Sequence, residues 1–200
     1  MIEWISGGIT KYFKNNNGLL TEQDLLKINY SLQVIIGDTV KLMIIFCLFF
    51  LLNELPIFTL SLIILITTRP LWGGIHCKTF NTCLFVSMIY FLTILLFSKC
   101  YFEFSNKFYI VMFIITFIII SVYAPCRNKK RPIINRLRLK IFSIISLSCW
   151  TIIFFRSSNM YIRNCIYMSI LFQLIQIIII NGKVGIQNAK IYKFFLKYIN

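Results

Sequence analysis

The feature that most constrains this sequence is a series of apolar segments whose lengths approach the thickness of a bilayer's hydrocarbon core. The segments are rich in isoleucine, leucine and phenylalanine and are continuous, not alternating. In lipid, every backbone polar group must be bonded within the protein, so a spanning chain forms helices or a closed barrel. Continuous runs favour helices over barrel strands. The sequence therefore predicts an all-α, polytopic membrane protein.

Composition supports this class, because 58% of the 200 residues are hydrophobic and the mean hydropathy is +0.80. A water-soluble fold of this size could not bury so much apolar surface. Asn53-Glu54-Leu55-Pro56 interrupts one apolar run, so a tight hairpin or a half-inserted pair fits the first two spans as well as two full crossings. The predicted transmembrane helices, about six in number, are roughly residues 39–53, 55–68, 82–98, 108–124, 139–155 and 161–180.

Two amphipathic helices are predicted ahead of these spans. The first has its apolar residues at helical spacing, as expected for a helix that lies in the membrane surface. Thr21 followed by Asp24 resembles a capping box, and a second apolar stripe follows it. Residues 1–36 are thus predicted to be interfacial and residues 37–200 to form a single transmembrane domain. The two stripes are Ile2, Ile5, Ile9, Tyr12 and Phe13, and then Leu25, Ile28, Leu32 and Ile35.

The net charge of +15 does not indicate nucleic-acid binding, because the basic residues lie between apolar spans instead of on a soluble face. Lysine and arginine concentrate in residues 127–140 and in the C-terminal tail. With six spans, these regions share a side with the N-terminus and with residues 69–78. Since short cytoplasmic loops hold the excess of basic residues, both termini and residues 69–78 are predicted to be cytoplasmic.

The candidate chemistry lies in residues 69–83, between two predicted spans, where Pro70 and a glycine pair are predicted to break the helix. His76 is the single histidine, and Cys83 follows seven residues later. A thiolate is a nucleophile, and a neighbouring imidazole can take its proton and return it to a leaving amine. On one straight helix the two would be about 10 Å apart, so the pair requires the chain to fold back, which Gly73-Gly74 would permit.

Simpler interpretations remain open for each of these residues. A histidine at a membrane interface is often a headgroup or capping contact, and a cysteine in an apolar run is often part of the core. The glycine amides could donate to an oxyanion, although flexibility alone is the commoner reason for two glycines. Cys77 is poorly placed to pair with His76, because adjacent helical side chains point about 100° apart. No metal site is predicted, since the chain has one histidine and no paired CxxC pattern.

The sequence resembles the accessory gene regulator B (AgrB) family of membrane cysteine peptidases. The resemblance rests on Arg69, Gly73-Gly74, His76 and Cys83 at their mutual spacing. A second similar patch is Tyr123-Ala124-Pro125, followed by a basic run and by Pro132-Ile133. The length, the amphipathic N-terminal region and the number of spans also agree. One departure is Cys77, where alanine is usual in the family.

The resemblance implies a cysteine endopeptidase that processes a quorum-sensing propeptide, with Cys83 as nucleophile and His76 as base and then acid. It implies closure of a thiolactone or lactone, no cofactor, a lipid bilayer around the chain, a homodimer, and a propeptide with an amphipathic leader and an acidic C-terminal region. The alternatives are a non-enzymatic small transporter or exporter subunit, and a structural membrane partner. The oxyanion or positioning candidates are Arg69, Gly73, Gly74 and Lys78, and the substrate-binding candidates are Lys129, Lys130 and Arg131.

Overall fold

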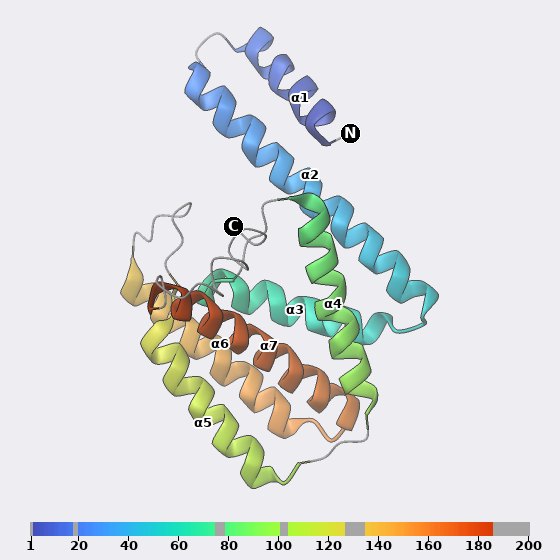
Figure 1. The fold of residues 1–200 in the computed structure, drawn as a ribbon, viewed down its shortest axis with the longest axis vertical. Helices are drawn as coiled ribbons and strands as arrows, with labels where there is room; N and C mark the ends of the chain where they lie inside the picture. Colours follow the sequence, from blue (N-terminus) through green and yellow to red (C-terminus); the bar gives the residue numbers. More distant parts are fainter. Residues whose placement is uncertain (1, 18–19, 75–78, 101–103, 127–134, 186–200) are drawn as a thin grey trace. The chain divides into compact units, whose positions relative to one another are not determined.

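The computed structural model confirms the predicted all-α class (Figure 1). It describes residues 2–17, 20–74, 79–100, 104–126 and 135–185, the last five of these by their backbone alone. These residues contain seven helices and no strand. The helices are α1 (Ile2–Asn16), α2 (Glu22–Leu51), α3 (Leu55–Trp72), α4 (Phe80–Lys99), α5 (Asn106–Tyr123), α6 (Arg136–Arg156) and α7 (Met160–Gly185). They fall into two compact units, Met1–Asn53 and Glu54–Asn200.

In the first unit, α1 lies beside α2 (Figure 1). The predicted second amphipathic helix and the first predicted span are continuous in α2, a single helix of 30 residues. Such a helix is about 45 Å long, which exceeds the hydrocarbon thickness and leaves its N-terminal turns available to extend beyond it. The boundary between residues 36 and 37 therefore lies within a helix. Whether α1 lies in the membrane surface stays a prediction.

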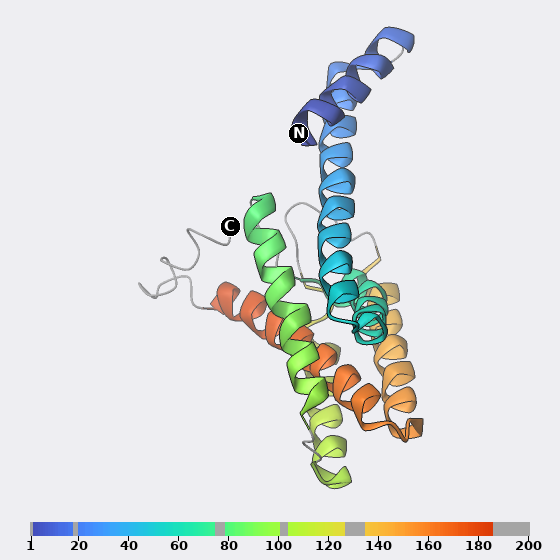
Figure 2. The same ribbon diagram turned by 90° about the vertical axis from the view of Figure 1, so that its right-hand side faces the viewer.

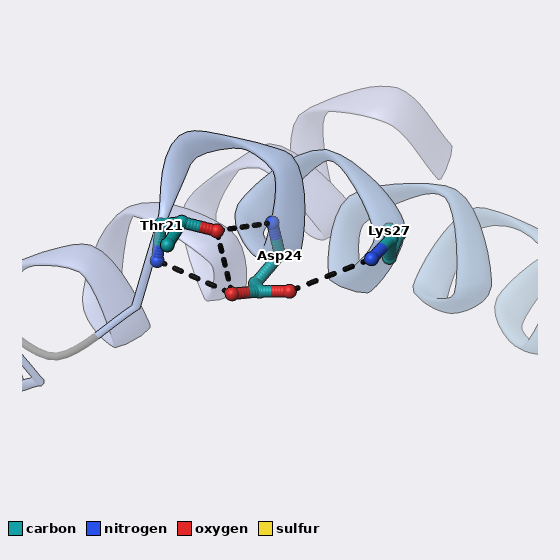
Figure 3. Close-up of polar contacts among 3 residues, drawn as sticks. All are labelled: Thr21, Asp24 and Lys27. Carbon is teal, nitrogen blue, oxygen red and sulfur yellow. Dashed lines mark hydrogen bonds and ion pairs between the residues drawn. The ribbon is translucent and has the colours of Figure 1, made fainter.

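The predicted capping box at the start of α2 is confirmed (Figure 3). The Asp24 backbone N–H donates to Thr21 Oγ1 at 3.3 Å, and Asp24 Oδ2 accepts from the Thr21 backbone N–H at 3.3 Å. The Thr21 hydroxyl also donates to Asp24 Oδ2 at 2.6 Å, while Lys27 Nζ lies 3.6 Å from Asp24 Oδ1. Donors that the first helical turn would leave unpaired are satisfied in this way, so α2 begins at a defined residue.

In the second unit, α7 contacts each of the other four helices, α3, α4, α5 and α6, and thus lies at the centre of the packing (Figures 1 and 2). A buried cluster joins α3, α5, α6 and α7. Aromatic rings contribute much of its volume, with Phe154 packed against both Tyr109 and Phe113. The cluster consists of Ile64, Trp72, Tyr109, Phe113, Ile120, Ala124, Cys126, Leu147, Trp150, Phe154, Ile166, Ile170 and Ile177.

Helices α2 to α7 are each long and apolar enough to cross a membrane. Large apolar side chains cover their outer surfaces; for example, Leu51 is 78% exposed and Leu96 is 65% exposed. Surfaces of this extent are not left bare in water, so they identify the lipid-facing sides of a multi-pass membrane protein. Each predicted span lies almost wholly within one of these six helices, and α3, with 18 residues, has the length of a full crossing.

The helix ends of the second unit gather at two opposite ends of the bundle. At one end, the Cys126 backbone N–H donates to the Trp72 carbonyl oxygen at 3.1 Å, which joins the C-terminal ends of α3 and α5. At the other end, Lys99 pairs with Glu54, and the Asn164 amide donates to the Cys100 carbonyl oxygen at 3.1 Å. The chain thus alternates in direction from α3 to α7, as the predicted spans require.

The capping box generates a prediction about the start of α2. Thr21→Ala should weaken this end of the helix by about 1 kcal/mol, since the hydroxyl that accepts from the Asp24 N–H is lost. Hydrogen exchange followed by mass spectrometry should show faster exchange over residues 22–26. Thr39→Ala is the matched control, because the Thr39 hydroxyl is exposed and only donates to Ile35 O of its own helix. Equal exchange in both variants would contradict the assignment.

Candidate active site

The last turn of α3 leads into the candidate site. The prediction that Pro70 breaks the helix is wrong, because α3 continues through Pro70 to Trp72. Contacts with α6 hold this turn: Trp72 is fully buried, its Nε1 donates to the Ser143 carbonyl oxygen at 3.3 Å, and the Ser143 hydroxyl donates to the Leu71 carbonyl oxygen at 3.1 Å. Tertiary contacts therefore outweigh the hydrogen bond that proline cannot donate.

The glycine pair does end the helix, as predicted, and Gly73 has a definite structural reason to be glycine. Its φ of 93° and ψ of 172° lie in a region that is essentially restricted to glycine. A Cβ at this position would lie 2.8 Å from Cys126 Cβ, at the end of α5. The main chain of Gly73 thus passes directly against Cys126, and this contact accompanies the hydrogen bond from Cys126 to Trp72.

Gly74 provides the surface on which the Arg69 side chain lies. A Cβ on Gly74 would be 2.8 Å from Arg69 Nε and 3.3 Å from Gln176 Oε1 of α7. The Arg69 side chain and the carboxamide of Gln176 therefore lie on the same side of Gly74. Three of the predicted site residues, Arg69, Gly73 and Gly74, are brought together at one end of the bundle.

Cys83 lies at the start of α4, at the end of the first helical turn. Thr79 is the N-cap: its hydroxyl accepts from the Thr82 backbone N–H at 3.3 Å, and its carbonyl oxygen accepts from the Cys83 backbone N–H at 3.1 Å. The Cys83 side chain is half-buried. Because the N-terminal end of a helix favours negative charge, this end of α4 suits anionic chemistry.

The predicted pairing of His76 with Cys83 required the chain to turn between them. The described residues meet the first part of that condition, since α3 ends at Trp72 and Cys83 belongs to a separate helix that begins at Phe80. His76, Cys77 and Lys78 lie outside the described residues, as do Lys129, Lys130 and Arg131. The distance from His76 to Cys83 and the role of the basic run stay predictions.

Sequence reasoning missed the contribution of α7. The Thr68 hydroxyl, one residue before Arg69, lies 2.6 Å from Gln173 Oε1, and both side chains are buried. Gln173 and Gln176 are one turn apart, so one contacts the last part of α3 and the other flanks Gly74. Two glutamines three residues apart in the otherwise apolar stretch of residues 170–180 were the signal that could have found them, because polar side chains within a span usually face the protein interior.

The fold and this arrangement define a multi-pass helical membrane protein with a candidate thiol site at the end of its helices. A sequence model of the accessory gene regulator B family matches residues 6–177, and the chain belongs to this family. It is 49% identical over 195 residues to a putative AgrB-like protein of Clostridium beijerinckii, an alignment that covers 98% of both chains. It is 31% identical over 161 residues to accessory gene regulator protein B of Staphylococcus saprophyticus, covering 77% of this chain and 81% of the relative. No solved structure matches the chain with statistical significance.

The geometry of Gly73 generates a second prediction. Gly73→Ala should destabilise the second unit by about 2 kcal/mol or more, because the backbone conformation is strained for alanine and the new methyl group meets Cys126. Thermal unfolding in detergent should show the loss. The double variant Gly73→Ala/Cys126→Gly should recover only part of it, since the backbone strain persists.

Gly7→Ala is the control for this prediction. Gly7 lies within α1 and a Cβ there would meet nothing within 4 Å, so the change should be neutral or slightly stabilising. Unfolding temperatures for Gly73→Ala and Gly7→Ala that do not differ would refute the packing argument.

Proposed function

We infer that this protein is a membrane-embedded cysteine endopeptidase and cyclase that cleaves the C-terminal part of a quorum-sensing propeptide. The observation that carries the proposal is the position of Cys83, which is half-buried in the first turn of α4, whereas Arg69 lies in α3 and Gly73 and Gly74 directly follow that helix. Membership of the accessory gene regulator B family supports it. In this proposal Cys83 is the nucleophile and His76 is the general base.

The first half-reaction forms an acyl-enzyme. His76 takes the proton of Cys83, and the thiolate sulfur attacks the carbonyl carbon of the scissile amide. The resulting oxyanion is stabilised by donors near the glycine pair, for which Arg69, Lys78 and the amides of Gly73 and Gly74 are the candidates. The imidazolium then gives its proton to the leaving amine, the carbon–nitrogen bond breaks, and a thioester remains on Cys83.

The second half-reaction closes the ring. His76 takes the proton of a cysteine thiol or serine hydroxyl within the bound peptide, and the sulfur or oxygen attacks the thioester carbonyl carbon. The bond to Cys83 breaks, and Cys83 leaves as a thiolate that recovers this proton from the imidazolium. Water must be kept from the thioester, and a site at the lipid boundary of the bundle serves that purpose. Since conversion of an amide into a thioester is uphill, removal of the cleaved fragment or of the cyclic product must draw the reaction forward.

The proposal places the site and both termini on the cytoplasmic side, following the distribution of basic residues. A substrate with an amphipathic leader would lie on the membrane surface, and its acidic C-terminal region would meet Lys129, Lys130 and Arg131. A homodimer belongs to the proposal as well. The described residues also offer no support for a transporter, because every fully buried polar side chain among them is uncharged.

Replacement of the nucleophile is the direct test. Cys83→Ala should abolish conversion of a co-expressed propeptide, and Cys83→Ser should reduce it by several orders of magnitude, because neither variant supplies a thiolate. Immunoblotting of the tagged propeptide would follow conversion, and mass spectrometry of the wild-type protein should find a peptide acyl group on Cys83.

Two other thiols provide matched controls for that experiment. Cys77→Ala removes the thiol beside the proposed base, and Cys149→Ala removes an exposed thiol of α6. Both variants should process the propeptide at the wild-type rate. Normal processing by Cys83→Ala would end the proposal, and loss in all three variants would show that the assay reports folding instead of chemistry.

The basic run generates a prediction about substrate affinity. The triple variant Lys129→Glu/Lys130→Glu/Arg131→Glu should raise KM on the order of tenfold, since each exposed charge contact contributes about 0.5 kcal/mol. The value of kcat should change little, and the wild-type KM should rise with ionic strength. Processing would be measured in nanodiscs with a synthetic propeptide.

Lys107→Glu serves as the control for charge alone, because Lys107 is exposed at the start of α5, at the end of the bundle away from Gly73. A propeptide whose acidic residues are replaced by lysine should be processed better by the triple variant than by the wild type. An unchanged KM in the triple variant would remove these three residues from substrate binding.

A further inference from the structure

A group of buried polar side chains lies between α3, α4 and α7, just below the candidate site. It consists of Thr68 of α3, Tyr90 of α4, and Ser169 and Gln173 of α7, and we call it the interhelical polar cluster. Gln173 is 2% exposed and Thr68 is fully buried. These helices cross an apolar solvent, so a polar group retained at such depth needs a physical reason.

Gln173 connects the two helices that carry the two parts of the site. Its Oε1 lies 2.6 Å from the hydroxyl of Thr68, the neighbour of Arg69, and this hydroxyl is shared with the Ile64 carbonyl oxygen of α3 at 2.5 Å. The Gln173 side chain also approaches Tyr90 of α4, the helix that carries Cys83 in its first turn. The side chains of Ser169 and Gln173 both approach Tyr90, yet the Tyr90 hydroxyl, the Ser169 hydroxyl and Gln173 Nε2 reach hydrogen-bonding geometry with no described residue.

The burial of the side chains increases along these helices, away from the candidate site. Tyr90 is seven residues after Cys83 and lies on the same face of α4, about 10 Å deeper along the axis. Cys83, Arg69 and Gln176 are half-buried, whereas Tyr90, Thr68 and Gln173 are buried. The interhelical polar cluster thus lies deeper in the bundle than the half-buried residues of the candidate site.

Stability alone does not explain a hydrogen bond of this kind. Replacing both partners of a buried pair with apolar groups of similar shape is often neutral or stabilising, whereas removing one partner leaves the other unpaired at a cost. The Gln173 donor that finds no partner adds to that cost. A pair that contributes little net stability but fixes one geometry is expected where position matters.

We propose that Gln173 is a positioning residue for the peptidase reaction. Through its hydrogen bond with Thr68, it fixes the position of residues 69–74, which form the end of α3 and the glycine pair. The inference rests on the proposed function, since this position matters only if Arg69 and the glycine pair serve chemistry at Cys83. Gln173 does not touch the peptide. It acts through Thr68, and the adjacent Gln176 extends the same face of α7 to Gly74.

The test uses shape-conserving variants of the full chain in nanodiscs. Thr68→Val, Gln173→Met and the double variant should each lower kcat for propeptide cleavage on the order of tenfold to a hundredfold, with KM unchanged, because a small misplacement of catalytic groups has effects of that size. Thr68→Ser keeps the hydroxyl and should retain wild-type activity. Thr116→Val is the matched control, since the buried Thr116 hydroxyl donates only to Met112 O of its own helix.

Thermal unfolding separates positioning from stability. Thr68→Val should unfold at a lower temperature, because it leaves Gln173 Oε1 without its donor, whereas the double variant should return close to the wild-type temperature. Its kcat should nevertheless stay low. Recovery of kcat together with stability in the double variant would overturn the proposal and leave the pair a purely structural role.

A readout independent of catalysis distinguishes failure of this inference from failure of the proposed function. The Gly73 N–H donates to Arg69 O at 2.9 Å in the wild type, so hydrogen exchange over residues 69–74 reports on this segment directly. Exchange should accelerate in Thr68→Val, Gln173→Met and the double variant but not in Thr116→Val. Unchanged exchange would overturn the positioning role, whereas normal processing by Cys83→Ala would overturn the proposed function and, with it, the catalytic part of this inference.

Discussion

The structure depends on one constraint, which is that lipid surrounds the second unit. Polar side chains must therefore form hydrogen bonds within the bundle or lie at the helix ends. Large apolar side chains face outward along the spans, while buried hydroxyls mostly donate to carbonyl oxygens of their own helix, as Thr116 does to Met112 and Ser98 to Ile94. The few polar contacts that pass between helices then acquire unusual weight, because lipid offers no competing partner. Two such contacts lie where α3 meets α6 and α7: Trp150 Nε1 donates to the Thr67 hydroxyl, and the Thr68 hydroxyl lies 2.6 Å from Gln173 Oε1.

The two ends of the second unit are built differently. Away from the candidate site, side chains join the helix ends, with Lys99 paired to Glu54 and Arg163 placed over the rings of Tyr109 and Phe154. At the site end, a main-chain hydrogen bond from Cys126 to Trp72 and the close approach of Gly73 to Cys126 join the ends of α3 and α5. Because Gly73 has no side chain, the main chain at the end of α3 can approach Cys126 closely.

Much of the fold could be predicted from the sequence because lipid imposes a simple rule on span length. The capping box at Thr21 was predictable for a different reason: its two residues are only three positions apart in the sequence and need no tertiary information. Pro70 shows where the approach fails: a local rule predicts a break, but the burial of Trp72 against α6 comes from residues far away in the chain. Of the candidate site, the glycine pair and Cys83 were predictable from motif and spacing, whereas Gln173 was not, because its partner Thr68 is 105 residues distant.

The packing of α3 against α6 also has a practical consequence. The chain contains three tryptophans, and two of them, Trp72 and Trp150, are buried at this contact, where their indole N–H groups donate to Ser143 O and to the Thr67 hydroxyl. The third, Trp4, is 82% exposed in α1. Once Trp4 is replaced by phenylalanine, tryptophan fluorescence reports on the contact of α3 with α6, which includes the helix turn that immediately precedes Gly73. The protein therefore carries its own reporter beside the residues whose chemistry is in question.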